Sequence, residues 1–207
     1  MTRDASMPNL LSKKTLSSDS TMTQHITPES ANWQYVGFQA HTLKAGQTFA
    51  METQDNEVCV VLLSGKANAA TADQSWENIG ARESVFDQKA PYAVSAPAQD
   101  RIEYKALTDI ELAVCQAPGK GNYQARLITP ADCQFETRGV GTNTRHVCNV
   151  LFGILAADSL LVCEVITPSG NWSSYPPHKH DQDAAPTETQ LEETYYHRID
   201  PPQGFVF

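Results

Sequence analysis

The chain has 207 residues, of which 41% are hydrophobic and 19% are charged, and its formal net charge is -9. That length and apolar content are enough for one large domain or two small ones. A negative surface without a cluster of lysines and arginines repels phosphate backbones, so we expect no nucleic-acid partner, and no apolar run is long enough to predict a membrane span.

The N-terminal residues are rich in serine and threonine and lack the apolar segment of a secretory signal, which predicts a disordered tail over residues 1–24. Without such a signal, an odd number of cysteines and no C-x-x-C pair predict a cytoplasmic protein with reduced, mostly buried thiols. The five cysteines are Cys59, Cys115, Cys133, Cys148 and Cys163.

Short apolar runs and period-2 alternation dominate the rest of the chain. They predict strands over residues 57–70, 101–107, 110–118, 159–170, 192–199 and from 204 onward. Ser64-Gly65 inside the first of these runs predicts a hairpin-type turn. No segment shows the apolar spacing of a long helix, so the expected fold class is all-β, either a sandwich or a barrel.

A domain boundary is expected within residues 116–134, which contain two prolines and two glycines between strand-like runs. Two β-modules, an N-terminal one over 25–118 and a C-terminal one over 119–207, fit this pattern better than one continuous barrel.

The most specific local feature is the pair His178 and His180. Side chains at i and i+2 of an extended segment point to the same face, so a strand here presents two imidazoles to one ion. Pro176-Pro177 stiffens the entry and restricts Tyr175 to an extended conformation. An isolated H-x-H pair is more often part of a solvated loop, but the carboxylates that follow favour a metal site.

Those carboxylates are Glu192 and Glu193, and one of them is the natural third ligand. Two neutral imidazoles and one carboxylate suit Zn, Mn, Fe or Ni, with Zn or Mn favoured, and they leave coordination positions open for chemistry.

The stretches SGNWSSYPPHKHDQD and LEETYYHRIDPPQGFVF, with WENIGARESVFD upstream, resemble the 5-deoxy-glucuronate isomerases of myo-inositol catabolism. The resemblance implies a bicupin with two β-barrel or jelly-roll modules and a metal in the second. It also implies isomerisation of an aldose, 5-deoxy-D-glucuronate, to the ketose 5-dehydro-2-deoxy-D-gluconate.

Within this resemblance, His178 and His180 match the H-x-H of related uronate isomerases, and Glu193-Thr194-Tyr195 matches their E-x-Y triplet. Glu193 is therefore the preferred third ligand. Alternation then places Tyr195 and His197 on the metal side, and Glu192 and Tyr196 on the other.

Two departures from the family pattern affect the expected activity. The family's fourth ligand, a histidine on a later strand, has no counterpart before Phe207, and Cys148 stands where relatives carry histidine. We therefore expect an incomplete second barrel with an exposed edge near Leu161, Val162 and Phe205, association into a homo-oligomer, and little activity of this chain alone.

An aldose–ketose isomerisation moves a hydrogen between C1 and C2, and a divalent ion stabilises the charge that develops on oxygen. Tyr195, His197 and Glu192 are the candidate bases, and both proton transfer and hydride shift remain open.

The small-molecule substrate is a uronate, whose carboxylate calls for a cation, either Arg198 or Arg145. Lys179 is less favoured because it points away from an ion held by His178 and His180. The alternative function is a non-catalytic cupin that binds a metal or a sugar acid. His41 and the segment 79–86 are interpreted as structural.

Overall fold

The computed structural model describes residues 11–13, 21–153, 155–174 and 178–206, and within them regular structure is almost entirely strand. The strands are β1 (Met22–Ile26), β2 (Gly37–Leu43), β3 (Thr48–Glu52), β4 (Asn56–Ser64), β5 (Ala67–Thr71), β6 (Ser75–Ile79), β7 (Tyr92–Ala96), β8 (Arg101–Ala106), β9 (Ile110–Pro118), β10 (Arg126–Ile128), β11 (Gln134–Arg138), β12 (Arg145–Leu151) and β13 (Val162–Ile166). The helices are α1 (Pro28–Ala31) and two 3₁₀ turns, η1 (Val85–Asp87) and η2 (Gly141–Asn143). The expected all-β class is confirmed.

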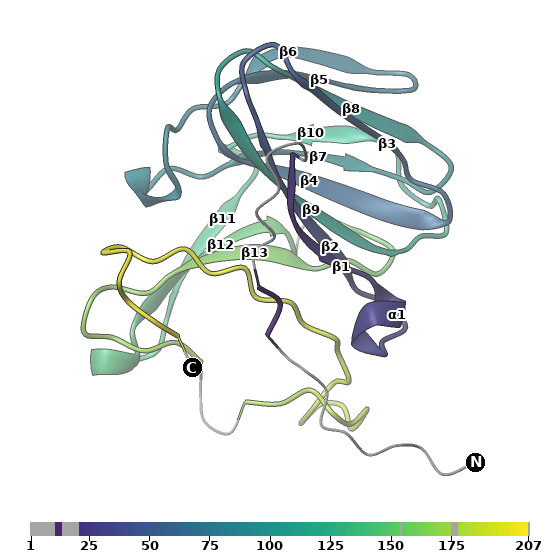
Figure 1. Cartoon of the computed structure of the whole chain (residues 1–207). Coiled ribbons are helices and arrows are strands. Elements are labelled where there is room, and N and C mark those ends of the chain that lie inside the picture. The colour runs from purple at the N-terminus through teal and green to yellow at the C-terminus, as the bar shows by residue number, and fades with distance from the viewer. Residues whose placement is uncertain (1–10, 14–20, 154, 175–177, 207) are drawn as a thin grey trace.

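The strands form three antiparallel sheets stacked as layers (Figure 1). The middle sheet has the order β1-β2-β9-β4-β7-β10, one outer sheet has the order β3-β8-β5-β6, and the other has the order β11-β12-β13. None of the helices in the described ranges is long and apolar enough to cross a membrane.

Strand β4 contributes side chains to two separate hydrophobic cores. Its alternate side chains enter different clusters, one on each side of the middle sheet. Those facing the four-stranded sheet are Val58, Val60 and Leu62, and those facing the three-stranded sheet are Cys59, Val61 and Leu63. A strand buried on both faces reads as a continuous apolar run, which is what this segment shows.

The hairpin-type turn predicted at Ser64-Gly65 is wrong. Strand β4 belongs to the middle sheet, whereas β5 pairs with β6 and β8 in the outer sheet, so this turn carries the chain from one layer to another. Gly65 has φ +82° there, and a Cβ would lie 2.3 Å from the Asp109 carbonyl oxygen. Glycine is therefore required by both the backbone conformation and the close approach.

Two expected segment limits can be compared with the strands. The tail predicted over 1–24 is wrong at its end, because β1 begins at Met22 and pairs with β2; residues 1–10 and 14–20 lie outside the described part. Strand β10 lies beyond the predicted boundary at 118 yet pairs with β7, so the middle sheet extends to Ile128. The division into two cupin modules stays a prediction.

The strands expected over 192–199 and after 204 are absent from the described residues (Figure 1). Residues 192–199 make no ladder with another strand, and side chains hold this segment in place, as shown below. Leu161 and Phe205 are exposed as expected, but Val162 is buried because it packs in the core between the middle and three-stranded sheets. Phe207 lies outside the described residues.

All five cysteines are free thiols. Cys59, Cys133 and Cys148 are buried and Cys115 is partly buried, as expected, but Cys163 is exposed. The reason is that Cys163 points to the face of β13 turned away from the middle sheet, opposite to its neighbours Val162 and Glu164.

A buried ion pair joins the first ten strands to the three-stranded sheet. Arg82 donates two hydrogen bonds of 2.8 Å to the carboxylate of Glu164 on β13. Its guanidinium also donates to the carbonyl oxygens of Leu63 and Lys89, at 2.8 and 3.0 Å. This geometry supports the structural interpretation of the segment 79–86.

Candidate metal centre

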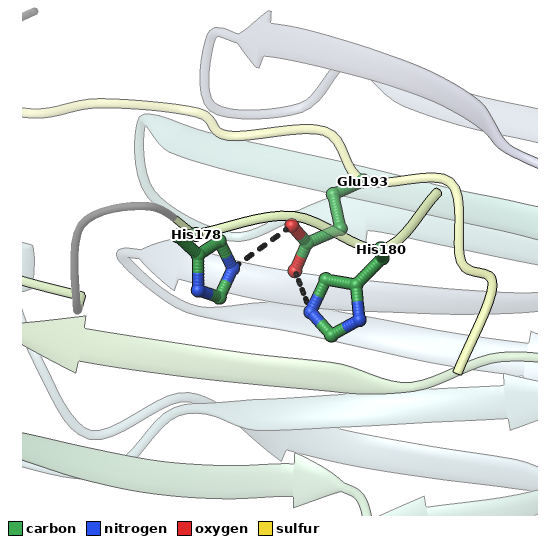
Figure 2. A group of neighbouring side chains, drawn as sticks. All are labelled: His178, His180 and Glu193. Carbon is green, nitrogen blue, oxygen red and sulfur yellow. Dashed lines mark hydrogen bonds and ion pairs between the residues drawn. The ribbon is translucent and has the colours of Figure 1, made fainter. Parts of the chain in front are cut away.

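The structure brings His178, His180 and Glu193 together (Figure 2). One ligand atom from each lies within 4.8 Å of the others, and among the described residues no second group of three such side chains was found. His178 Nε2 lies 3.3 Å from Glu193 Oε2, and His180 Nε2 lies 3.9 Å from Glu193 Oε1. The carboxylate thus faces both imidazoles.

The backbone that carries the histidines is not the strand that the sequence predicts. Residues 178–183 have no regular structure, and Tyr175 with Pro176-Pro177 lies outside the described residues. Glu188 organises the loop instead: its carboxylate accepts from the backbone N–H groups of Asp181 and Gln182 at 2.7 and 2.9 Å, and from Lys179 Nζ at 2.8 Å. Lys179 therefore points away from the histidines, as expected.

The tautomer of His180 follows from its neighbour. Its Nδ1 lies 3.0 Å from the carbonyl oxygen of Thr189, and a carbonyl can only accept. Nδ1 therefore carries the proton, which leaves Nε2, the atom that faces Glu193, with a free lone pair. A backbone carbonyl behind the ring is the usual way in which proteins orient a metal-binding histidine.

Tyr195 and His197 lie on the same side as Glu193. The Tyr195 hydroxyl donates to Glu193 Oε2 at 3.2 Å and lies 3.5 Å from His178 Nε2. The His197 ring stacks on the Tyr195 ring, with centroids 5.8 Å apart. Partial burial raises the pKa of Tyr195, the charge of Glu193 raises it further, and partial burial lowers the pKa of His197.

Glu192, expected as a candidate base, points to the other side. Its two carboxylate oxygens accept three backbone N–H bonds, from Gln34 and Tyr35 at 2.7 Å and from Val36 at 2.9 Å. A carboxylate with three amide donors has little freedom to approach a substrate. This geometry favours an anchoring role over the catalytic role expected for Glu192.

The two candidate cations for a substrate carboxylate differ in their surroundings. Arg198 forms an ion pair with Glu111 on β9, so its charge is already neutralised. Arg145 donates to two uncharged oxygens of Asn143, the carbonyl at 3.3 Å and the side-chain amide at 2.9 Å. No ion pair joins Arg145 to a carboxylate within the part of the chain that the structure describes.

The donor set fits a divalent transition metal. Two imidazole nitrogens and one carboxylate are the ligands that Zn, Mn, Fe and Ni accept, and three protein ligands leave positions for substrate. The side chains of His178, His180 and Glu193 are 40%, 27% and 37% exposed, so a small molecule can reach them.

Sequence reasoning missed Glu188 and Glu111. Glu188 orders the histidine loop, and Glu111 binds both the Tyr196 hydroxyl, at 2.7 Å, and Arg198. The sequence could have singled out Glu111, because it is the only charged residue in the apolar run IELAVCQAP. Glu188 lies in the polar stretch DQDAAPTETQ, where nothing distinguishes it from its acidic neighbours.

Comparisons with known proteins show the family of the chain. A family model described as KduI/IolB family matches residues 10–207. The chain is 57% identical over 181 residues to a 5-deoxy-glucuronate isomerase of Geobacillus kaustophilus, covering 87% of this chain and 66% of that protein. It is 42% identical over 187 residues to a protein of the same name from Bacillus subtilis (strain 168), covering 90% of this chain and 69% of the relative.

The fold also matches a solved structure. A crystal structure of an IolB-like protein from Salmonella typhimurium superposes with a TM-score of 0.90 at 48% sequence identity, covering 95% of this chain and 74% of that one. The chain thus spans about two thirds of the length of the Geobacillus relative.

Proposed function

The chain belongs to the KduI/IolB family, and from this membership we propose that it takes part in the isomerisation of 5-deoxy-glucuronate at a divalent metal held by His178, His180 and Glu193. The observation that carries the proposal is the convergence of these three donors in a chain whose relatives bear the name of that isomerase. Zn or Mn is the proposed ion, because both accept nitrogen and oxygen ligands with open coordination positions.

A divalent ion at this position would supply Lewis-acid stabilisation of the negative charge that develops on the substrate oxygen. The protein's own groups account for the proton movements. Tyr195 stays protonated at neutral pH because its pKa is raised, so its hydroxyl serves as a donor beside Glu193. His197 stays neutral because its pKa is lowered, so its imidazole is the proposed proton acceptor.

Arg145 is the proposed partner of the substrate carboxylate. It lies opposite Arg138 on the face of the three-stranded sheet that also carries Cys163. Neighbouring groups desolvate the Cys163 thiol, although the residue keeps an exposed surface, and this raises its pKa; the nearby charge of Glu193 raises it further. Arg145 therefore shares a sheet face with the metal centre and keeps an unneutralised charge, whereas the charge of Arg198 is paired with Glu111.

Elemental analysis and turnover test the proposal together. The purified chain should contain close to one equivalent of metal, and His178→Ala or His180→Ala should remove the metal together with any conversion of 5-deoxy-glucuronate that the unaltered chain shows. Turnover in deuterated water separates the two chemical routes: deuterium appears at the product carbon in proton transfer and is absent after a hydride shift. An unchanged metal content in both histidine variants would refute the metal site.

Substrate recognition has a matched pair of variants. Arg145→Met should raise KM for the uronate while changing kcat less, because it removes binding that the ground state and transition state share. Arg101→Met, which removes a cation from β8 of the outer four-stranded sheet, should leave KM unchanged. Metal binding by wild-type protein without any turnover would favour the alternative function, a cupin that binds a metal or sugar acid without catalysis.

A further inference from the structure

Residues 192–197 behave like a strand without a strand partner. Their exposure alternates, with the even-numbered residues half-buried and the odd-numbered residues exposed. The odd side carries Glu193, which faces both histidines (Figure 2), and Tyr195, whose hydroxyl donates to Glu193 Oε2 and lies 3.5 Å from His178 Nε2. No backbone ladder holds these residues in the described chain, so some other contact must determine where Glu193 stands.

Glu192 provides the first such contact. Its carboxylate binds the backbone N–H groups of residues 34–36, more than 150 positions earlier in the chain. Hydrogen bonds that involve a charged acceptor are about twice as strong as neutral ones. The bond to Gln34 uses Oε1 and the bonds to Tyr35 and Val36 use Oε2, so both oxygens are engaged.

The receiving loop is itself rigid. Thr27 and Ser30 form a capping box at the start of α1, and Asn32 ends the helix in the left-handed conformation with φ 56°. The backbone N–H of Trp33 donates to the carbonyl of Pro28 at 2.7 Å, which returns the chain over the helix. Residues 34–36 follow directly and present their N–H groups to Glu192 from this fixed base.

Tyr196 provides the second contact, on the other side of Glu193. Its hydroxyl donates to Glu111 Oε1 on β9 at 2.7 Å, and its ring lies 5.4 Å from the ring of Phe38 on β2. Arg198 donates to the other oxygen of Glu111. Strands β2 and β9 are paired neighbours in the middle sheet, so this contact too is on a rigid element.

We propose that Glu192 and Tyr196 are positioning residues, which attach the segment to the middle-sheet region at two points and thereby hold Glu193 at the metal. The inference rests on the proposed function, because it takes Glu193 as a ligand. In this proposal the half-buried side chains of the segment fix its position, and the exposed side chains face the metal and the substrate. It also predicts that metal affinity depends on a loop more than 150 residues away in sequence.

Zn²⁺ affinity, measured by competition with a chromophoric chelator, tests the inference directly. Outer contacts of this kind contribute about 10- to 100-fold to metal affinity, so Glu192→Ala should weaken Zn²⁺ binding by that factor. Glu192→Gln, which keeps one acceptor oxygen, should recover part of the affinity. Tyr196→Phe keeps the ring on Phe38 and loses one hydrogen bond, so about a 3- to 10-fold loss is expected.

Glu103→Ala is the matched control, since Glu103 pairs with Arg101 on strand β8 of the outer four-stranded sheet and should leave Zn²⁺ affinity unchanged. The visible spectrum of bound Co²⁺ supplies a second readout, because a displaced Glu193 alters the ligand field. The Co²⁺ spectrum should change in Glu192→Ala and stay the same in Glu103→Ala.

The outcomes separate the two proposals. A wild-type chain that binds no Zn²⁺ refutes the proposed function, and the positioning roles with it. If the wild-type chain binds Zn²⁺ and both Glu192→Ala and Tyr196→Phe bind it equally well, the positioning roles alone are refuted. This holds even if the melting temperature of the variants falls. Should Glu192→Ala not fold, Glu192→Gln decides: reduced affinity in the folded protein supports the inference, and unchanged affinity overturns it.

Discussion

Removal of one partner from the Arg82–Glu164 ion pair should measure how firmly the three-stranded sheet is attached to the rest of the protein. The Arg82 side chain is 2% exposed and that of Glu164 is 22% exposed. In Glu164→Ala the guanidinium stays buried and keeps its bonds to Leu63 and Lys89, but it loses both bonds to the carboxylate.

The magnitude follows from the burial of the charge that remains. Breaking a buried pair by removing one partner costs about 3–5 kcal/mol, because the other charge is left uncompensated. Glu164 is partly accessible, so water can enter the space that its carboxylate leaves, and we expect a loss near the lower end, about 3 kcal/mol in the free energy of unfolding. With a urea m-value of about 3 kcal/mol/M, the midpoint falls by about 1 M.

Urea unfolding followed by tryptophan fluorescence provides the assay, and two further variants make it decisive. Glu136→Ala removes an exposed carboxylate that pairs with Arg138 and accepts a hydrogen bond from Asn149 on the same sheet, and it should shift the midpoint less than Glu164→Ala does. The double variant Arg82→Met with Glu164→Met removes both charges and should recover much of the loss. A midpoint for Glu164→Ala equal to that of Glu136→Ala would refute the reasoning from burial.

Two more variants address the buried polar groups His41 and Glu57. Burial lowers the pKa of His41 from 6.5 to about 4, so between these two pH values the unfolded chain binds a proton that the folded chain does not. The free energy of unfolding should therefore fall by about 2 kcal/mol between pH 7.5 and 5. In His41→Gln the fall should be smaller. Equal pH slopes of unfolding free energy in both proteins would contradict this. Glu57 accepts backbone N–H bonds from residues 158–160 and thereby anchors this loop. Glu57→Gln has one acceptor oxygen in place of two, so it should lower the free energy of unfolding by about 2 kcal/mol in a urea titration. An unchanged midpoint would count against this anchoring role.

Local pattern was sufficient for five of the thirteen described strands, because β4, β5, β8, β9 and β13 overlap segments that the sequence predicts as strands. The predicted run 57–70 contains most of β4, and the predicted alternation in 101–107 contains β8, because side-chain period and β-branched content act within a few residues. The alternation around Glu193 likewise predicted which side chains of residues 192–197 share a side, although His178 and His180 come together from a loop and not from the predicted strand. These properties depend on the backbone period alone, and that period is written in the sequence.

Pairing between distant segments was not predictable in the same way. The turn at Gly65 has the composition of a hairpin, yet β4 and β5 lie in different sheets, because β4 pairs with β7 and β9 instead. The choice of partner depends on burial of both faces of β4, which is a property of the assembled layers. A four-residue turn signal carries no information about it.

The segment 192–199 shows the same limit at the site itself. Its alternation predicted a strand, but the alternation reflects a segment with His178 and His180 on one side and the middle-sheet region on the other. Period-2 patterning reports two different environments, and it does not require a backbone partner. The E-x-Y match had already favoured Glu193 as the residue that faces the histidines, but only the tertiary structure brought the N–H groups of residues 34–36 to Glu192, because that contact depends on a loop far away in the chain.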